Sequence, residues 1–139
     1  MRICVIDGQG GGIGAAIIKR LKEVYREEHE VIALGTNAVA TAQMMKARAN
    51  RGASGENAIL RTVPRVDVIL GCLSIVLANS MMGEVTPKMA EAIASAAAPK
   101  ILLPLTQEKV EIVGLSPEPL PHLVEKIVSH RLKEILRHV

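Results

Sequence analysis

The sequence predicts one α/β domain of three layers, in which helices cover both faces of a mostly parallel sheet. Short runs rich in β-branched residues alternate with longer segments of helical periodicity, and this alternation is typical of parallel sheets. The 139 residues suffice for one hydrophobic core and are too few for two. We therefore expect residues 1–139 to form a single domain.

Four runs of apolar, largely β-branched residues predict the main strands, at residues 2–7, 30–34, 67–72 and 100–103. Between residues 50 and 55 the chain turns, so any further strand there is very short. Residues 109–114 alternate charged and apolar side chains, and we expect them to pair antiparallel at an edge of the sheet.

Helices are expected between these strands, where apolar residues recur every three or four positions next to capping residues. Thr36 or Asn37 is suited to cap the second helix, and Ser54 the third. Thr86 followed by Pro87 starts the fifth helix. The predicted helices span residues 12–26, 37–49, 54–63, 74–82, 86–97 and 120–138.

Composition argues against several classes of function. Tyr25 is the only Phe, Trp or Tyr residue, so no aromatic platform can stack the bases of a single-stranded nucleic acid. The 17 Lys and Arg residues exceed the 14 Asp and Glu residues by only three, which does not predict a nucleic-acid partner. Because Asp7 and Asp67 are the only aspartates, no metal site built from several carboxylates is expected.

Cysteine use and hydropathy predict a cytoplasmic protein without a membrane partner. Cys4 and Cys72 lie far apart, each within an apolar run, as is typical of buried, reduced thiols. The longest apolar stretch, residues 68–78, is too short to span a bilayer. The first expected strand begins at Arg2, which leaves no room for a signal peptide before it.

The most informative motif is a loop between the first expected strand and helix, with five glycines among the seven residues from Gly8 to Gly14. A glycine inside a regular element destabilises the fold by about 0.5–1 kcal/mol relative to alanine. Five glycines in one short loop therefore indicate a structural or functional requirement. At the start of a helix, backbone N–H groups and the helix dipole favour a negatively charged group. The loop therefore predicts a site for a phosphate-bearing ligand; the alternative is a turn that only links strand and helix.

The spacing of Gly8, Gly12 and Gly14 is similar to the GxxxGxG loop of short-chain dehydrogenases, a variant of the Rossmann fingerprint. This resemblance implies a Rossmann-like fold and a nucleotide or dinucleotide such as NAD or NADP. We expect the amides of residues 10–13 to hold the phosphate and the segment after the second strand to face the ribose or base. The expected cofactor-binding residues are Gly8, Gln9, Gly10, Gly11, Gly12, Ile13, Gly35, Thr36 and Asn37.

The loop also departs from known patterns. Asp7 stands where the dehydrogenase pattern has Thr, and its carboxylate is better suited to accept hydrogen bonds from loop amides than to face a pyrophosphate. No acidic residue follows the second strand to bind an adenosine ribose, so the sequence does not distinguish NAD from NADP. Thr36 and Asn37 suit helix capping equally well. Ala15 follows Gly14 where a P-loop requires Lys, which excludes that motif.

No catalytic set emerges from the remaining residues. Short-chain dehydrogenases use a Tyr and a Lys four residues later, whereas Tyr25 is followed at that spacing by His29. We expect Tyr25 to pack on a helix face. Three further histidines are eight residues apart, do not converge on a helix and are expected to be solvated: His122, His130 and His138. Three residues where a helix begins are candidates for ligand contact or for capping: Ser54, Glu56 and Asn57.

Four sequence blocks together resemble a known family: IDGQGGGIG at residues 6–14, ALGTN at 33–37, GENAI at 55–59 and GEVTPKMAEAIA at 83–94. The family comprises small bacterial proteins catalogued as a domain of unknown function and regarded as Rossmann-like. The resemblance extends over essentially the whole chain. It implies the single-domain fold and gives no catalytic residues, because the family has no established activity.

The sequence leaves two main functions open. The first is a protein that binds a nucleotide or dinucleotide, a small phosphate-bearing ligand, at the carboxyl ends of the strands. The second is a cofactor-free assembly or interaction protein whose loop is filled by its own side chains. A small enzyme that uses Asp7 or Glu56 as acid or base is a third possibility. Met81, Met82 and the apolar run before them exceed what one sheet needs as cover, so we also expect a homo-oligomer.

Overall fold

The computed structural model describes residues 1–137 and contains one sheet of five strands, all parallel. The strands lie in the order β3-β2-β1-β4-β5. They span Arg2–Asp7 (β1), Glu30–Gly35 (β2), Arg51–Ser54 (β3), Val68–Cys72 (β4) and Lys100–Leu103 (β5). The predicted α/β fold with a parallel sheet is confirmed, and the third strand is indeed very short, with four residues.

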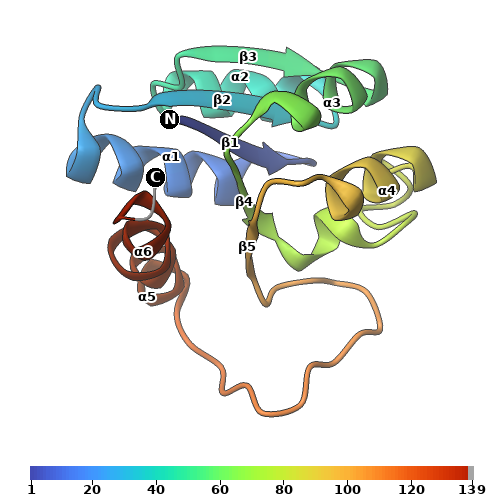
Figure 1. Ribbon diagram of the computed structural model, residues 1–139. Helices are drawn as coiled ribbons and strands as arrows, with labels where there is room; N and C mark the ends of the chain where they lie inside the picture. Colours follow the sequence, from blue (N-terminus) through green and yellow to red (C-terminus); the bar gives the residue numbers. More distant parts are fainter. Residues whose placement is uncertain (138–139) are drawn as a thin grey trace.

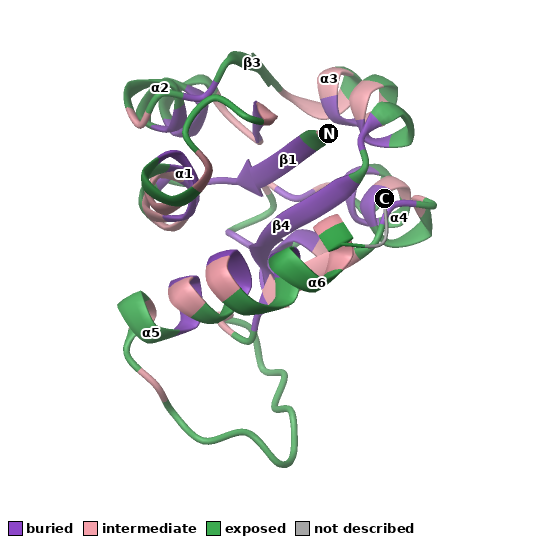
Figure 2. Cartoon of the chain, turned by 60° about the vertical axis from the view of Figure 1, so that its left-hand side comes forward, coloured by how far each residue is buried: buried purple, intermediate pink, exposed green. Residues whose placement is uncertain are grey.

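Helices cover both faces of the sheet (Figure 1). They are α1 (Gly12–Tyr25), α2 (Ala38–Lys46), α3 (Glu56–Thr62), α4 (Pro87–Ser95), α5 (Leu120–Glu125) and α6 (Leu132–Arg137). A π-helical segment, Lys126–Arg131, joins α5 to α6. Figure 2 shows α1 and α2 on one side of β1 and β4, with α3 and α4 on the other. The last helical region packs beside α1.

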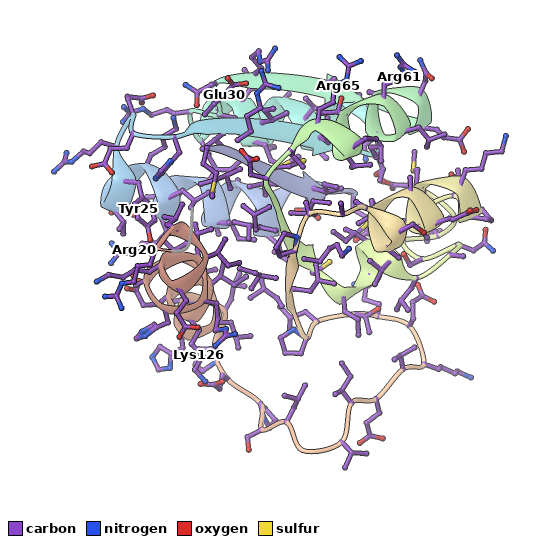
Figure 3. All side chains as sticks on the ribbon, viewed as in Figure 1. Arg20, Tyr25, Glu30, Arg61, Arg65 and Lys126 are labelled. Atoms are coloured by element: carbon purple, nitrogen blue, oxygen red, sulfur yellow. The ribbon has the colours of Figure 1, made fainter. Side chains whose placement is uncertain are left out.

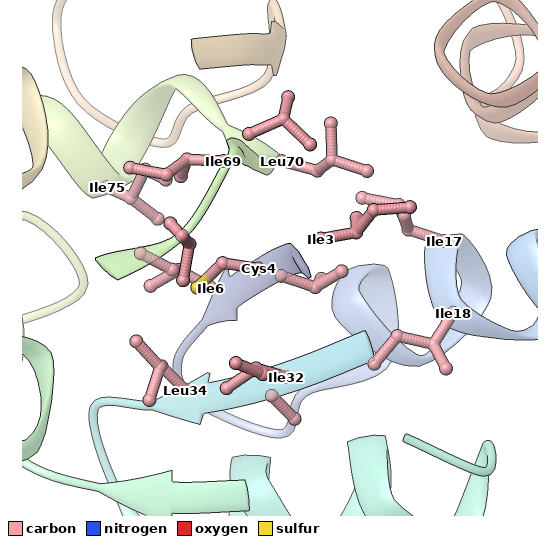
Figure 4. Close-up of a cluster of buried hydrophobic side chains, with 14 of the residues drawn as sticks. Ile3, Cys4, Ile6, Ile17, Ile18, Ile32, Leu34, Ile69, Leu70 and Ile75 are labelled. Atoms are coloured by element: carbon pink, nitrogen blue, oxygen red, sulfur yellow. The ribbon is translucent and has the colours of Figure 1, made fainter. Parts of the chain in front are cut away.

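The core is aliphatic because the sequence has no Phe or Trp. The central strand β1 is buried from Ile3 onward, and all five residues of β4 are buried. Ile17 of α1 lies beside Ile3, while Ile75 covers the other side of β4 (Figure 4). This packing fixes the position of Asp7 and of the glycine loop that follows it, because both continue directly from the buried central strand.

The prediction of a helix over residues 74–82 is wrong. A short 3₁₀ turn, Leu73–Val76, is followed by tight turns in which Asn79, Met81 and Met82 all have positive φ. The hydroxyl of Ser80 donates to the carbonyl oxygen of Ser74 at 2.5 Å, which ties the turn together without a helix. Met81 is thereby buried, whereas Met82 is 97% exposed. An apolar run without periodicity does not distinguish these turns from a buried helix.

The expected antiparallel strand over residues 109–114 is also absent from the described part of the chain. This segment is exposed, and Val110 and Ile112 each have 46% of their surface accessible to solvent. Pro104 follows β5 directly, and the π-helical segment packs against β5. The segment pairs with neither edge strand, β3 or β5, and its alternating side chains stay exposed, so residues 104–119 form an extended loop (Figure 1).

Capping of the helices agrees with the sequence in two cases out of three. Asn37 caps α2 through Ala40 N–H, and Thr86 caps α4. Ser54 does not cap α3, because Gly55 with φ 96° occupies the capping position. The final helical region ends at Arg137 in the described part of the chain, and the predicted helical residue His138 lies outside it.

Candidate functional site

The carboxyl ends of β1 and β4 meet at the topological switch point of the sheet, since the chain runs outward through β2 and β3 and then returns to the other side of β1. Open α/β sheets bind ligands in the crevice at this point. A cavity of about 280 Å³ lies here, lined among others by Asp7, Ile13, Cys72, Ser74 and Thr106. The cavity thus adjoins the glycine loop on the side of β4, not on the side of β2.

Asp7 organises the glycine loop from within. Its Oδ1 accepts a hydrogen bond from the N–H of Gly8 at 2.8 Å, and its Oδ2 accepts one from the N–H of Gly14 at 2.7 Å. Burial raises the pKa of Asp7, and these two hydrogen bonds oppose the rise. The carboxylate therefore holds the shape of the loop, the role that the sequence favoured for it.

Glu84, which the sequence analysis missed, closes the loop from outside. Its Oε1 accepts hydrogen bonds from the N–H of Gln9 at 2.8 Å, from Oγ1 of Thr36 at 2.7 Å and from Nδ2 of Asn37 at 2.7 Å. Desolvation raises the pKa of Glu84, but the three hydrogen bonds together lower it by a larger amount. The pKa of Glu84 therefore lies below its ordinary value. Two of the residues expected to face ribose or base thus bind an internal carboxylate.

Glu84 places an acidic group at the end of β2, where the residues that directly follow the strand include none. Asn37 and Glu84 are 47 residues apart in the chain, and no local pattern links them. The block of residues 83–94 contains Glu84 at its second position, but its residue type alone does not indicate a contact with the loop. Only the turn that replaces the expected helix brings Glu84 to the end of β2.

Packing explains three of the five loop glycines. A Cβ atom at Gly11 would lie 2.7 Å from the carbonyl oxygen of Ala40, and Gly11 also has φ 74°. A Cβ atom at Gly14 would lie 2.6 Å from Sδ of Met44, so this glycine lets α1 approach α2 closely. A Cβ atom at Gly8 would lie 2.5 Å from Sδ of Met81 and 2.5 Å from Oγ1 of Thr36. These glycines are required by the fold whether or not a ligand binds.

Gly10 and Gly12 differ from the other loop glycines. A Cβ atom at either position would meet no heavy atom within 4 Å, and neither residue has a left-handed φ. Among residues 1–137, the hydrogen bonds that close the loop use the N–H groups of residues 8, 9, 11 and 14, and the N–H of Ile13 also acts on Asp7 and lowers its pKa. None uses the N–H of Gly10 or Gly12. Internal contacts therefore leave these two amides open at the start of α1.

The candidates near the start of α3 do not line the cavity. Oγ of Ser54 lies 2.6 Å from Oγ1 of Thr41, and Asn57 is exposed. Oε1 of Glu56 accepts a hydrogen bond from Oγ1 of Thr86 at 2.6 Å, which ties α3 to the start of α4. The structure therefore gives Glu56 a structural contact and does not bring it to the glycine loop.

Tyr25 lies at the end of α1 that is farthest from the glycine loop. Its hydroxyl donates to the carbonyl oxygen of Val128 at 2.7 Å, and its ring centroid lies 5.5 Å from that of His29. Burial and the nearby positive N-terminus lower the pKa of His29. Tyr25 thus packs α1 against the final helical region, as the sequence indicated.

Both cysteines are free and buried. Burial raises the pKa of Cys4 and of Cys72, and Cys72 also lines the cavity. Within residues 1–137, no group of three His, Cys, Asp or Glu side chains is placed to bind a metal ion together. None of the helices described combines the length and the apolarity needed to cross a membrane.

A solved structure with a similar fold is a dodecameric FMN-dependent Ubix-like decarboxylase from Escherichia coli O157:H7. The two superpose with a TM-score of 0.50 over 96% of this chain and 93% of that chain, with 14% sequence identity. At this identity the likeness shows a common fold and nothing more. The loop's similarity to short-chain dehydrogenases receives no support from this comparison, and no curated protein matches the sequence.

The family match covers almost the whole chain. The family described as Domain of unknown function (DUF3842) matches residues 2–136, which include the glycine loop, Glu84 and every strand of the sheet. The resemblance that the four sequence blocks indicated is thereby confirmed. The chain belongs to the DUF3842 family.

Proposed function

We propose that this protein binds a small phosphate-bearing ligand, a nucleotide, in the cavity at the switch point, with its phosphate against residues 10–13. The observation that supports the phosphate position most directly is the pair Gly10 and Gly12, whose neighbours Gln9 and Ile13 line the cavity. Both are glycines that neither packing nor backbone conformation requires, and both lie at the N-terminus of α1. Such positions permit an anion to approach backbone N–H groups closely.

The surroundings of the loop favour a mononucleotide over NAD or NADP. A dinucleotide would extend from the crevice to the end of β2, where Glu84 already binds Thr36 and Asn37. The cavity of about 280 Å³ on the β4 side is small for a ligand pocket. The structural neighbour is described as FMN-dependent, which makes FMN the first ligand to test.

Thermal unfolding in the presence of FMN, AMP, NAD and NADP tests the proposal. A ligand at one hundred times its Kd stabilises the native state by about 2.7 kcal/mol. For a domain of this size, this corresponds to a rise in Tm of roughly 5–12 °C. We expect a rise of this order with FMN or AMP, and a smaller one with NAD and NADP.

Two variants of nearly equal shape test whether the loop binds an anion. Gly10 has open space around it, so both Gly10→Asp and Gly10→Asn should fold. The aspartate places a negative charge beside the phosphate, whereas the asparagine does not. We expect Gly10→Asp to lose the ligand-dependent rise in Tm and Gly10→Asn to keep most of it. Equal responses of the two variants, or no response of the original protein to any nucleotide, would contradict the proposal.

A second candidate function is a cofactor-free assembly protein that forms a homo-oligomer. Hydrogen bonds from the loop to Asp7 and Glu84 favour it, because such a protein is expected to fill the loop with its own side chains. Met82 is 97% exposed and Val113 is 95% exposed, and exposed apolar side chains are typical of association surfaces. Size-exclusion chromatography with light scattering tests the oligomer. A stable oligomer that no nucleotide stabilises would favour this second function.

A further inference from the structure

A second cavity, beside β2, β3 and the end of α3, is lined by four arginines. Its volume is about 400 Å³. Arg2 begins β1 and Arg51 begins β3, while Arg61 lies in the last turn of α3 and Arg65 follows that helix. Figure 3 shows the side chains of Arg61 and Arg65 extending from α3 and the turn after it toward the same outer edge of the molecule. Three separate parts of the chain thus bring arginines to one cavity, which we call the arginine pocket.

Most of the positive charge in the arginine pocket has no internal partner. Nε of Arg51 donates to Oε1 of Glu30 at 2.9 Å. Asp67 accepts a hydrogen bond at 2.7 Å, but from the backbone N–H of Arg2 and not from its guanidinium group. Within residues 1–137, the other three guanidinium groups form no ion pair. No Asp or Glu is among the residues that line the pocket.

Helix electrostatics account for only half of this cluster. Basic side chains at the C-terminal end of a helix are favourable because of its dipole, which explains Arg61 and Arg65. Strands have only small net dipoles, so the same reason does not apply to Arg2 and Arg51. Like charges around one cavity repel each other, and a bound anion would remove this repulsion.

We propose that the arginine pocket binds a small phosphate- or pyrophosphate-bearing molecule at a site separate from the glycine loop. Planar guanidinium groups bind phosphate oxygens through paired hydrogen bonds, which makes arginine the most suitable residue for this purpose. Ile32 and Val66 give the pocket an apolar floor, which suits a phosphate ester with an apolar part. The six residues of β1 separate Arg2 from the glycine loop by about 17–20 Å, so a small ligand held by Arg2 does not reach the loop.

Isothermal titration with inorganic pyrophosphate at low ionic strength tests this proposal. All measurements use the Gly10→Asp background, in which the glycine loop is not expected to bind anions, so that failure of the nucleotide proposal does not affect the result. Arg61→Gln with Arg65→Gln removes two charges from the pocket. Arg26→Gln with Arg137→Gln removes two charges from exposed positions that do not line it. Circular dichroism establishes that each protein is folded.

We expect saturable binding of one pyrophosphate in the Gly10→Asp protein. Affinity should fall roughly tenfold or more in the pocket pair, because charge-assisted hydrogen bonds are lost. It should change by no more than about twofold in the control pair, whose charges act only through screened, long-range forces. Absence of saturable binding, or equal weakening in both pairs, would overturn the proposal.

Discussion

Replacing Glu84 with alanine tests whether the carboxylate that closes the glycine loop stabilises the fold. Oε1 of Glu84 accepts three hydrogen bonds of 2.7–2.8 Å, from Gln9, Thr36 and Asn37. Alanine removes the acceptor and leaves all three donors to water. It also removes the main polar contact between the turn after β4 and the end of β2.

The expected loss of stability follows from the number and exposure of these bonds. A hydrogen bond to a charged group contributes about 1.5–3 kcal/mol when it is well shielded. Glu84 is only partly buried, so water replaces much of each bond, and we expect Glu84→Ala to lower the free energy of unfolding by about 2 kcal/mol in total. Glu84→Gln keeps an acceptor oxygen without the charge, and its loss should be about half as large.

Urea denaturation followed by circular dichroism measures the effect, with the slope of the transition expected to stay constant. Glu91→Ala is the control, because Glu91 is an exposed residue of α4, and its effect should be within about 0.5 kcal/mol of zero. If Glu84→Ala and Glu91→Ala have equal effects, the three hydrogen bonds do not stabilise the fold and our reasoning is refuted.

The same prediction has a pH dependence. The folded-state pKa of Glu84 lies below its ordinary value of 4.5, so the unfolded chain binds the proton more tightly than the native state does. The stability that Glu84 contributes is therefore complete above about pH 4.5 and is lost as the pH falls through the folded-state pKa. Glu84→Gln should remove this part of the acid sensitivity.

Three further variants or reagents test other parts of the structure. A Cβ atom at Gly35 would lie 2.8 Å from the backbone nitrogen of Thr41, so Gly35→Ala should destabilise the protein by about 2 kcal/mol or more in urea denaturation; a loss below about 0.5 kcal/mol would contradict this packing. Cys4 is fully buried with a raised pKa, so a thiol reagent should modify it only after denaturation, and rapid reaction in the native protein would be inconsistent with its position. The hydrogen bond from Arg20 holds the pKa of Glu125 at about 2, so this pair stabilises above about pH 4.5 and the effect disappears as the pH falls toward 2. In an NMR titration Arg20→Gln should return the pKa of Glu125 toward 4.5, and an unchanged value would refute the assignment.

Elements that carry their own pattern were predictable from the sequence. Residues 2–7 and 100–103 are largely apolar runs of strand length, and α1 shows a clear helical period. β1 is almost wholly buried and β5 is half-buried. Residues 74–82 are mostly apolar, interrupted by Ser74, Asn79 and Ser80, and have no helical period. There, the contact from Ser80 to Ser74 and the burial of Met81 determine the backbone, and neither is visible in the local sequence. Residues 109–114 have the period of a strand but pair with neither edge of the sheet and stay exposed.

The candidate site was predictable only where it depends on neighbouring residues. The glycine loop, the hydrogen bonds of Asp7 and the capping role of Asn37 all involve residues within seven positions of one another. Glu84 reaches the loop across 75 residues of sequence, as measured from Gln9. In the arginine pocket, parallel pairing of β1, β2 and β3 brings Arg2 and Arg51 together, and α3 with the turn after it adds Arg61 and Arg65. Contacts of this range follow from topology, which composition and periodicity do not determine in detail.

The two carboxylates at the loop differ in how they would respond to the proposed nucleotide. Asp7 is buried and binds amides with both oxygens, so displacing it would disrupt the loop itself. Glu84 is partly exposed and belongs to a turn outside the helices and strands. A phosphate that extended from residues 10–13 toward β2 would therefore exchange with Glu84 and leave Asp7 in place. The phosphate would gain only the difference in free energy between its own hydrogen bonds and those of Glu84 that it replaces. The β2 side therefore adds little affinity. The binding free energy must come mainly from Gly10, Gly12 and the cavity beside β4.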